Sequence, residues 1–294
     1  MKYDLIIADP AKNITAFVLN QTPSRMGADL RAALAGALLA DPAIGAEQAA
    51  FVLPPGREGN RHWRLEMMGG EFCGNAARSF GLYVAGKTGL HGRHRVIIES
   101  SGLSVPIPVQ TDTETGRAEA EIPGPSVMTT LNFEGRSLPV CIFEGITHVL
   151  APDLEPDRER FFAIKAAFER TVRSLPGAFG ILFAGSPAGH AAVDAAPPPD
   201  AAGASPADAA VLSMTPAVYV DGTDSLVFES SCGSGSAALA VYRSRNLRDG
   251  EGRYRIAQPG GIIEVRIVKR AGAAASVAIG GRVTLRELVW DWAG

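Results

Sequence analysis

Short apolar runs separated by polar residues fill the first 125 positions, and this pattern predicts a strand-rich half of the chain. The run at 3–8, closed by Asp9-Pro10, is typical of a strand and its turn. One helix is predicted over 25–41, because Ala and Leu dominate there and Pro42 ends it. The strands expected in this half are 3–8, 17–19, 51–53, 63–67, 96–99, 103–109 and 118–122.

The pattern begins again after Pro123-Gly124-Pro125, which predicts a second half. Helices are expected over 157–174, where apolar residues share one face, and from 233 towards 246. Residues 191–210, rich in Ala, Pro and Asp, predict a surface loop. The strands expected here are 138–143, 148–150, 181–183, 217–220, 226–228, 262–268 and strands within 276–288. The expected domains are 1–125 with 276–294, and 126–275.

Two segments of these halves resemble each other. GGEFCGNAARSFG (69–81) and FESSCGSGSAALA (228–240) each place a Cys-Gly turn after a strand and before a helix of small residues. Their cysteines, Cys73 and Cys232, are separated by 232 − 73 = 159 positions. An internal repeat of this kind predicts a pseudo-twofold pair of domains that contain both helices and strands.

The amino-acid composition and net charge of the chain argue against several classes of function. The 294 residues are 46% hydrophobic and 20% charged, which is typical of a globular protein with a large core. A net charge of −3 gives no general attraction to nucleic acid or to an anionic membrane. No signal sequence and no apolar run of about 20 residues is found, so a soluble cytoplasmic protein is expected. Three cysteines are too few for a disulfide framework, and their spacing does not predict a metal site.

The repeated cysteines suit one kind of acid–base chemistry. A cysteine at a helix N-terminus lies near unpaired N–H groups, which can lower its thiol pKa from about 8.5. A facing pair across a cleft could remove a hydrogen from one side of a carbon and return one on the other side. The sequence therefore predicts a racemase with Cys73 and Cys232 as its two catalytic groups. The residues expected to bind the substrate carboxylate through backbone N–H groups are Gly74, Asn75, Gly233, Ser234 and Gly235.

A structural interpretation of the cysteines competes with the catalytic one. Cysteine is often buried as a small apolar residue, and this is the interpretation adopted for Cys141 within LPVCIF. For Cys73 and Cys232 the shared Cys-Gly context favours function, since packing alone gives no reason for it. A disulfide between them is disfavoured in a reducing cytoplasm.

At these motifs the sequence resembles the diaminopimelate epimerase superfamily, the two-cysteine racemases that use no cofactor. The resemblance includes Asn13 in NITAFVL, which is similar to the family's substrate-binding asparagine, and QPGG at 258–261. It implies an α+β fold of two pseudo-symmetric domains, each with a curved sheet wrapped around a central helix. It also implies no cofactor and no metal. CGNAARS replaces the CGNGARC usual in diaminopimelate epimerase, and the arginine that would grip a second carboxylate is absent.

A closer similarity is to the histidine racemases of staphylopine-type opine metallophore biosynthesis, in GGEFCGN (69–75) and SLVFESSCGSG (225–235). This resemblance implies interconversion of L-histidine and D-histidine. Glu47 is then a candidate to hold the imidazole through a charge-assisted hydrogen bond, and Gln48 to orient the substrate. Glu229 would support the Cys232 turn or contact the substrate amine, and His148 would either line the cleft or belong to the core.

Other functions stay open at this point. A diaminopimelate epimerase or a racemase of another amino acid would keep the fold and the cysteines. A non-catalytic amino-acid-binding protein would keep the cleft alone, and a dehydratase or isomerase of the same fold would not need the cysteine pair. In each case the partner is a small molecule, and the sequence leaves both a monomer and a homodimer open.

Overall fold

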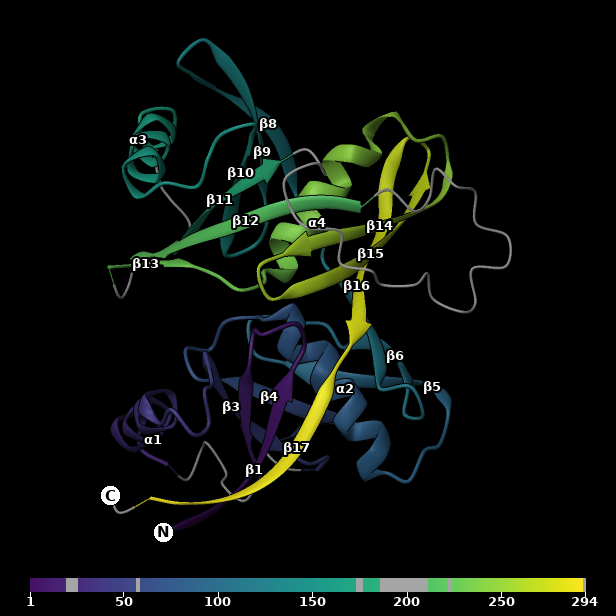
Figure 1. Ribbon diagram of the computed structural model, residues 1–294. Helices are drawn as coiled ribbons and strands as arrows, with labels where there is room; N and C mark the ends of the chain where they lie inside the picture. Colours follow the sequence, from purple (N-terminus) through teal and green to yellow (C-terminus); the bar gives the residue numbers. More distant parts are fainter. Residues whose placement is uncertain (20–25, 57–58, 173–176, 186–210, 222–223, 293–294) are drawn as a thin grey trace. The chain divides into compact units, whose positions relative to one another are not determined.

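A computed structural model describes residues 1–19, 26–56, 59–172, 177–185, 211–221 and 224–292 (Figure 1). The loop predicted at 191–210 lies outside these residues. The chain divides into two compact units, each described below by itself. Unit 1 consists of Met1–Ile122 and Ile279–Gly294, and unit 2 of Pro123–Ala278. No described helix is long and apolar enough to cross a membrane.

In its described residues, unit 1 contains a mixed sheet and two helices, α1 (Ala28–Ala40) and α2 (Gly74–Lys87). The strands are β1 (Lys2–Asp9), β2 (Thr15–Val18), β3 (Gln48–Leu53), β4 (Trp63–Met67), β5 (Arg93–Ser100), β6 (Ile107–Asp112), β7 (Arg117–Ile122) and β17 (Thr284–Asp291). Strand β1 pairs antiparallel with β17 on one side and β2 on the other, whereas the β2–β3 and β4–β5 pairs are parallel.

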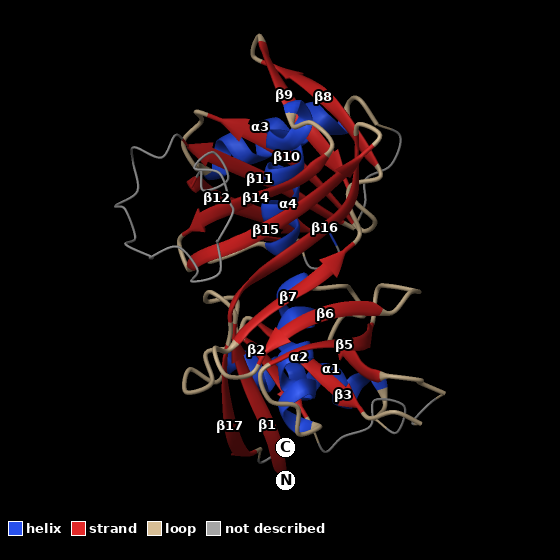
Figure 2. Ribbon diagram, turned by 90° about the vertical axis from the view of Figure 1, so that its right-hand side faces the viewer, coloured by secondary structure: helices blue, strands red, loops and turns tan. Residues whose placement is uncertain are grey.

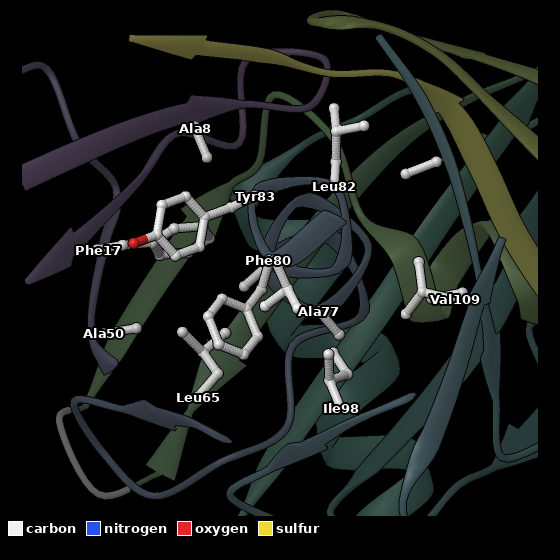
Figure 3. Close-up of a cluster of buried hydrophobic side chains, with 14 of the residues drawn as sticks. Ala8, Phe17, Ala50, Leu65, Ala77, Phe80, Leu82, Tyr83, Ile98 and Val109 are labelled. Carbon is white, nitrogen blue, oxygen red and sulfur yellow. The ribbon is translucent and has the colours of Figure 1, made fainter. Parts of the chain in front are cut away.

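The helix α2 forms the centre of unit 1, because it buries almost its whole length. The ring of Phe80 in α2 meets Phe17 of β2 edge to face, with ring centroids 5.8 Å apart. Both residues belong to the apolar cluster drawn in Figure 3. Gly81 lets the helix approach β6 closely, since a Cβ at this position would lie 2.5 Å from Cγ1 of Val109. The other helix, α1, contributes Leu34 to a second apolar cluster. The small residues of the predicted repeat therefore bring α2 against the sheet.

The part of unit 2 that the structure describes also has a mixed sheet with two helices, α3 (Arg158–Glu169) and α4 (Gly233–Arg243), and a short 3₁₀ helix at Ser244–Asn246. Figure 2 shows α2 among the strands of unit 1 and α4 among those of unit 2. The strands are β8 (Val127–Phe133), β9 (Arg136–Ile142), β10 (Ile146–Pro152), β11 (Ala178–Gly185), β12 (Val211–Val220), β13 (Ser225–Phe228), β14 (Gly250–Gln258), β15 (Gly261–Arg270) and β16 (Ala273–Arg282), whose last residues belong to unit 1.

The third cysteine belongs to the core of unit 2. Cys141 of β9 has no exposed surface, and its Sγ lies 3.8 Å from the carbonyl oxygen of Ala238 in α4. Burial raises the pKa of the Cys141 thiol to about 12, so the thiol stays neutral. The interpretation of Cys141 as a small core residue is confirmed.

Three sequence predictions need correction. The strand predicted at 103–109 begins only at Ile107, because Gly102 adopts a left-handed φ of 72° and Ser101 bonds by its hydroxyl to the carbonyl of Glu71. The helix predicted over 157–174 ends at Glu169, where Thr171 turns back to bond to the carbonyl of Phe168. Strands β8 and β14 were not expected, because the apolar and polar residues of VMTTLNF do not alternate regularly and GEGRYRIAQ contains two glycines and three charged residues.

Candidate active site

The two repeated cysteines have the same local geometry. Cys73 precedes α2 with φ −124° and ψ 113°, and Cys232 precedes α4 with φ −125° and ψ 117°. Each sulfur accepts a hydrogen bond from the backbone N–H three residues later, at 3.5 Å from Ala76 and 3.4 Å from Gly235. Both cysteines are thus N-cap residues, with sulfur in the place where a Ser or Asp oxygen is usual. The prediction that each Cys-Gly turn opens a helix is confirmed.

In unit 1, three predicted site residues form one hydrogen-bonded group at Cys73. The thiol lies 3.8 Å from Oδ1 of Asn13. The same oxygen accepts a bond of 3.2 Å from Nδ2 of Asn75, and Nδ2 of Asn13 donates to Oε2 of Glu47 at 2.9 Å. Asn13 and Asn75 are buried, whereas Cys73 is half-buried and Glu47 is exposed. A polar group with one open side therefore surrounds this sulfur.

Gln48 starts β3 directly after Glu47 and is paired in register with Thr15 of β2. Its alternate neighbours Ala50 and Val52 belong to the cluster around α2, so its side chain shares their face of the sheet. In the described structure Oε1 of Gln48 and Oγ1 of Thr15 are buried with no hydrogen-bond partner. Buried polar atoms of this kind usually have a partner, which makes Gln48 suited to meet a polar ligand.

In unit 2, Cys232 is held by two residues that were not among the predicted site residues. Its backbone N–H donates to Oε1 of Gln258 at 2.7 Å. Nε2 of Gln258 donates to Oγ of Ser236, and this hydroxyl donates to the carbonyl of Cys232 at 2.7 Å. The closed ring of bonds fixes the backbone on both sides of the sulfur. The QPGG motif marked the position of Gln258 but not this role.

His148 lies beneath the start of α4 and has no exposed surface. Its Nε2 is 2.9 Å from Oγ of Ser234, whose hydroxyl is 3.6 Å from Sγ of Cys232. The ring packs on Gly180, where a Cβ would lie 2.3 Å from Nδ1. Burial lowers the pKa of His148 to about 3, so the imidazole is neutral at physiological pH. This geometry places His148 behind Ser234, in the core of unit 2.

The electrostatics at Cys232 differ from the sequence expectation. Burial raises the pKa of the Cys232 thiol well above its ordinary value, and the nearby Glu229 carboxylate raises it further. Hydrogen bonds from Ser234 and from the Gly235 N–H act in the opposite direction but do not outweigh these two effects. The N–H of Gly235 at the helix N-terminus lowers the thiol pKa as expected, but burial and Glu229 outweigh it, so the pKa of Cys232 is raised on balance. At neutral pH this thiol carries its proton.

The glycines at the two turns serve close packing. A Cβ on Gly74 would lie 2.6 Å from Cδ1 of Ile279, and one on Gly235 would lie 2.7 Å from Cδ2 of Leu182. The N–H of Gly235 is already bonded to Cys232 Sγ. The first N–H groups of a helix have no intrahelical partner, and Gly74 and Gly233 hold these first positions in α2 and α4.

Arg78 was also missed as a residue of the site region. It lies in α2, fully buried, and its Nε donates to Oδ1 of Asn75 at 3.2 Å. The sequence contained one signal for Arg78: it is an arginine among the small residues of NAARS, and a charged residue in a buried stretch is rare. The described residues contain no group of three or more His, Cys, Asp or Glu side chains that could hold a metal ion.

Sequence comparisons match this chain to one family over most of its length. The family model described as the histidine racemase CntK N-terminal domain matches residues 2–186 and 207–287. A histidine racemase of Fusobacterium nucleatum is 28% identical over 269 residues, which cover 89% of this chain and 88% of that protein. A histidine racemase of Staphylococcus aureus is 24% identical over 280 residues, which cover 94% of this chain and 92% of the relative.

Solved structures share the fold at low sequence identity. A hydroxyproline epimerase from Agrobacterium vitis, crystallised with trans-4-hydroxy-L-proline, matches with a TM-score of 0.59 and 13% identity over 99% of this chain and 92% of its own. Methylitaconate-Δ-isomerase matches with the same TM-score and identity over 99% of this chain and 95% of its own. These likenesses confirm the predicted α+β epimerase-like fold.

Proposed function

This chain belongs to the histidine racemase CntK family, and we propose that it interconverts L-histidine and D-histidine with Cys73 and Cys232 as its two acid–base groups. The observation that carries the assignment of roles is the matched N-cap geometry of the two cysteines, one in each unit. The family membership supplies the substrate, because the curated relatives are named histidine racemases. D-histidine made in this way would serve opine metallophore biosynthesis.

The reaction requires one thiolate and one thiol. The thiolate takes the α-hydrogen as a proton, an S–H bond forms, and the electron pair of the broken Cα–H bond stays on the substrate. The thiol on the opposite face gives its proton to the same carbon and becomes the thiolate. Burial and Glu229 raise the pKa of Cys232, which keeps it a proton donor at neutral pH and makes its thiolate a strong base for the reverse direction.

Substrate binding in this proposal uses both helix starts and the Glu47 group. Backbone N–H groups of Gly74, Asn75, Gly233 and Ser234 would hold the carboxylate, where helix N-termini favour negative charge. Glu47 would accept a hydrogen bond from the imidazole. The bond that it receives from Asn13 leaves capacity for this, since a carboxylate accepts about four hydrogen bonds.

The decisive experiment follows deuterium from solvent into the α-position of L-histidine, together with chiral chromatography of the product. The native protein should incorporate deuterium and form D-histidine. Cys73→Ser and Cys232→Ser should each lose nearly all racemisation, while the buried Cys141→Ser serves as the matched control and should keep it. Full activity in either of the first two variants would refute the two-base assignment.

A panel of L-amino acids tests the substrate. Histidine should be turned over faster than diaminopimelate, alanine or hydroxyproline, and Glu47→Gln should reduce the rate on histidine more than the rate on any other substrate. Preference for another amino acid would transfer the proposal to that substrate. Ligand binding with no deuterium exchange would instead identify an amino-acid-binding protein. A cytoplasmic location belongs to the same proposal, because the mechanism needs both thiols reduced.

A further inference from the structure

We propose that Arg78 is a positioning residue for Cys73: through Asn75 it turns the carboxamide of Asn13 so that its oxygen, and not its NH₂ group, faces the sulfur. The catalytic meaning of this arrangement rests on the proposed function, whereas the arrangement itself concerns unit 1 alone.

The guanidinium of Arg78 connects three segments of unit 1. Its Nε donates to Oδ1 of Asn75 at 3.2 Å, its Nη2 to the carbonyl of Pro10 at 3.0 Å, and its Nη1 to the carbonyl of Arg282 at 3.4 Å. The side chain has no exposed surface. Removing a guanidinium from water is unfavourable, so its retention in α2 indicates a role that an apolar residue would not fill.

The contact with Pro10 fixes the turn that delivers Asn13. The two residues between Pro10 and Asn13 are Ala11 and Lys12, which adopt left-handed φ values of 73° and 66°. This conformation is unfavourable for residues other than glycine. The backbone N–H of Lys12 also donates to Oδ1 of Asp9 at 2.6 Å. Because the turn is strained, its conformation depends on such contacts, and Arg78 provides one from α2, the helix that Cys73 caps.

The polarity of the hydrogen bonds is set from both ends. An arginine has only donors, so Asn75 must present its oxygen to Arg78 and its NH₂ group to Asn13. Asn13 must then present its oxygen to Asn75 and its NH₂ group to Glu47, whose carboxylate only accepts. Reversing either carboxamide would set donor against donor or oxygen against oxygen. We call these four residues the Arg78–Glu47 chain.

The oxygen of Asn13 that results from this order lies 3.8 Å from Cys73 Sγ. An acceptor in this position can bond to the S–H form of Cys73 but not to its thiolate, so it favours the protonated sulfur. A thiolate formed beside such an oxygen is a stronger base, which suits the removal of a weakly acidic α-hydrogen. In the proposed function, the oxygen of Asn13 would therefore increase the basicity of Cys73, and Arg78 would help to hold this oxygen in place without touching the substrate.

The test measures the pH dependence of alkylation of Cys73 by iodoacetamide, followed by mass spectrometry of the peptide that contains it. Four proteins are compared: native, Arg78→Met, Glu47→Gln and the double variant. Loss of the Arg78 cation by itself raises the pH at which the alkylation rate of Cys73 is half-maximal, and loss of the Glu47 anion lowers this pH. These two charge effects add. Only the double variant frees both ends of the chain and lets Asn13 turn its NH₂ group towards the sulfur.

We expect the half-maximal pH of the double variant to lie lower than the sum of the single shifts by about half a pH unit or more. Additive shifts overturn the proposal. Arg61→Met, which removes an exposed cation of unit 1, is the matched control and should combine additively with Glu47→Gln. Arg78→Lys keeps a donor-only cation and should restore the native profile.

If Arg78→Met does not fold, Asn75→Ala interrupts the same chain while Arg78 stays in place, and the same non-additive shift is expected with Glu47→Gln. The alkylation profile requires no turnover. If the alkylation of Cys73 shows the expected non-additive shift but the protein has no racemase activity, the proposed function is wrong and the positioning role of Arg78 stands. The converse result, full racemisation with additive shifts, would remove the positioning alone.

Discussion

The side-chain oxygen of Gln258 lies 2.7 Å from the backbone nitrogen of Cys232 and accepts its hydrogen bond. Gln258→Leu would leave this buried N–H without its acceptor, which should reduce the free energy of unfolding by about 1–3 kcal/mol. Racemisation should slow as well, because the Cys232 turn loses its support. Urea unfolding measures the loss of stability. Gln110→Leu, at an exposed position of β6, is the control and should change neither quantity; an equal loss in both variants contradicts the role of Gln258.

His148 should make stability depend on pH. Its pKa is about 3 in the folded protein because of burial, against 6.5 for an ordinary histidine. Below pH 6.5 the unfolded chain therefore binds more protons at this site than the folded one. The contribution of His148 to the free energy of unfolding is fully present above pH 6.5, and it falls by about 1.4 kcal/mol for each pH unit below that value.

His148→Gln should flatten this dependence between about pH 7 and pH 5, although it will be less stable than the native protein at pH 7 because the ring packing is lost. Urea unfolding across this range gives the slope for each protein. His91→Gln, at an exposed site, should keep the native slope. A native slope in His148→Gln as well would mean that His148 does not titrate in this way.

The thiol of Cys232 should react slowly with iodoacetamide near pH 8, because burial and Glu229 raise its pKa and limit the thiolate. Glu229→Gln removes the nearby negative charge, so the pKa of Cys232 falls and alkylation should become several-fold faster. Peptide mass spectrometry follows this site separately from Cys73. Glu144→Gln, an exposed acid of unit 2, should leave the rate unchanged. An unchanged rate in Glu229→Gln would show that burial alone controls the thiol.

Gly102 should be intolerant of any side chain. It has a left-handed φ of 72°, and a Cβ would lie 2.4 Å from the backbone nitrogen of Phe72, next to Cys73. Gly89 has a similar φ of 75° with nothing within 4 Å, so Gly89→Ala should cost only the left-handed strain of about 1–2 kcal/mol. Gly102→Ala should cost more by a steric contribution of about 1–3 kcal/mol. Thermal and urea unfolding compare the two; equal losses would rule out the clash.

The cysteine sites show what a sequence can predict and what it cannot. The repeated Cys-Gly context predicted two helix starts, because a turn of small residues before an Ala-rich segment depends on local backbone preference. The thiol pKa of Cys232 was not predictable in the same way. It depends on burial and on Glu229, and the degree of burial follows from tertiary packing.

Long-range hydrogen bonds were equally hidden. Asn13 and Glu47 are 34 positions apart, and Cys232 and Gln258 are 26 apart, so no periodicity connects them. The strand expected from 103 failed for a similar reason: the apolar residues were present, but Ser101 and Gly102 hold the chain in a turn against the segment before Cys73. Residue type identified the candidates, and tertiary contacts decided their roles.

Strands β1 and β17 pair along their whole lengths, from Lys2 opposite Asp291 to Asp9 opposite Thr284. During synthesis, Asp9 at the end of β1 is translated 284 − 9 = 275 positions before Thr284 at the start of its partner β17. The whole of unit 2, which ends at Ala278, is translated between these two strands, so one side of β1 stays unpaired until unit 2 has been made. Completion of unit 1, which carries Cys73, thus depends on β17, and a deletion that removes β17 would act on the unit that contains β1.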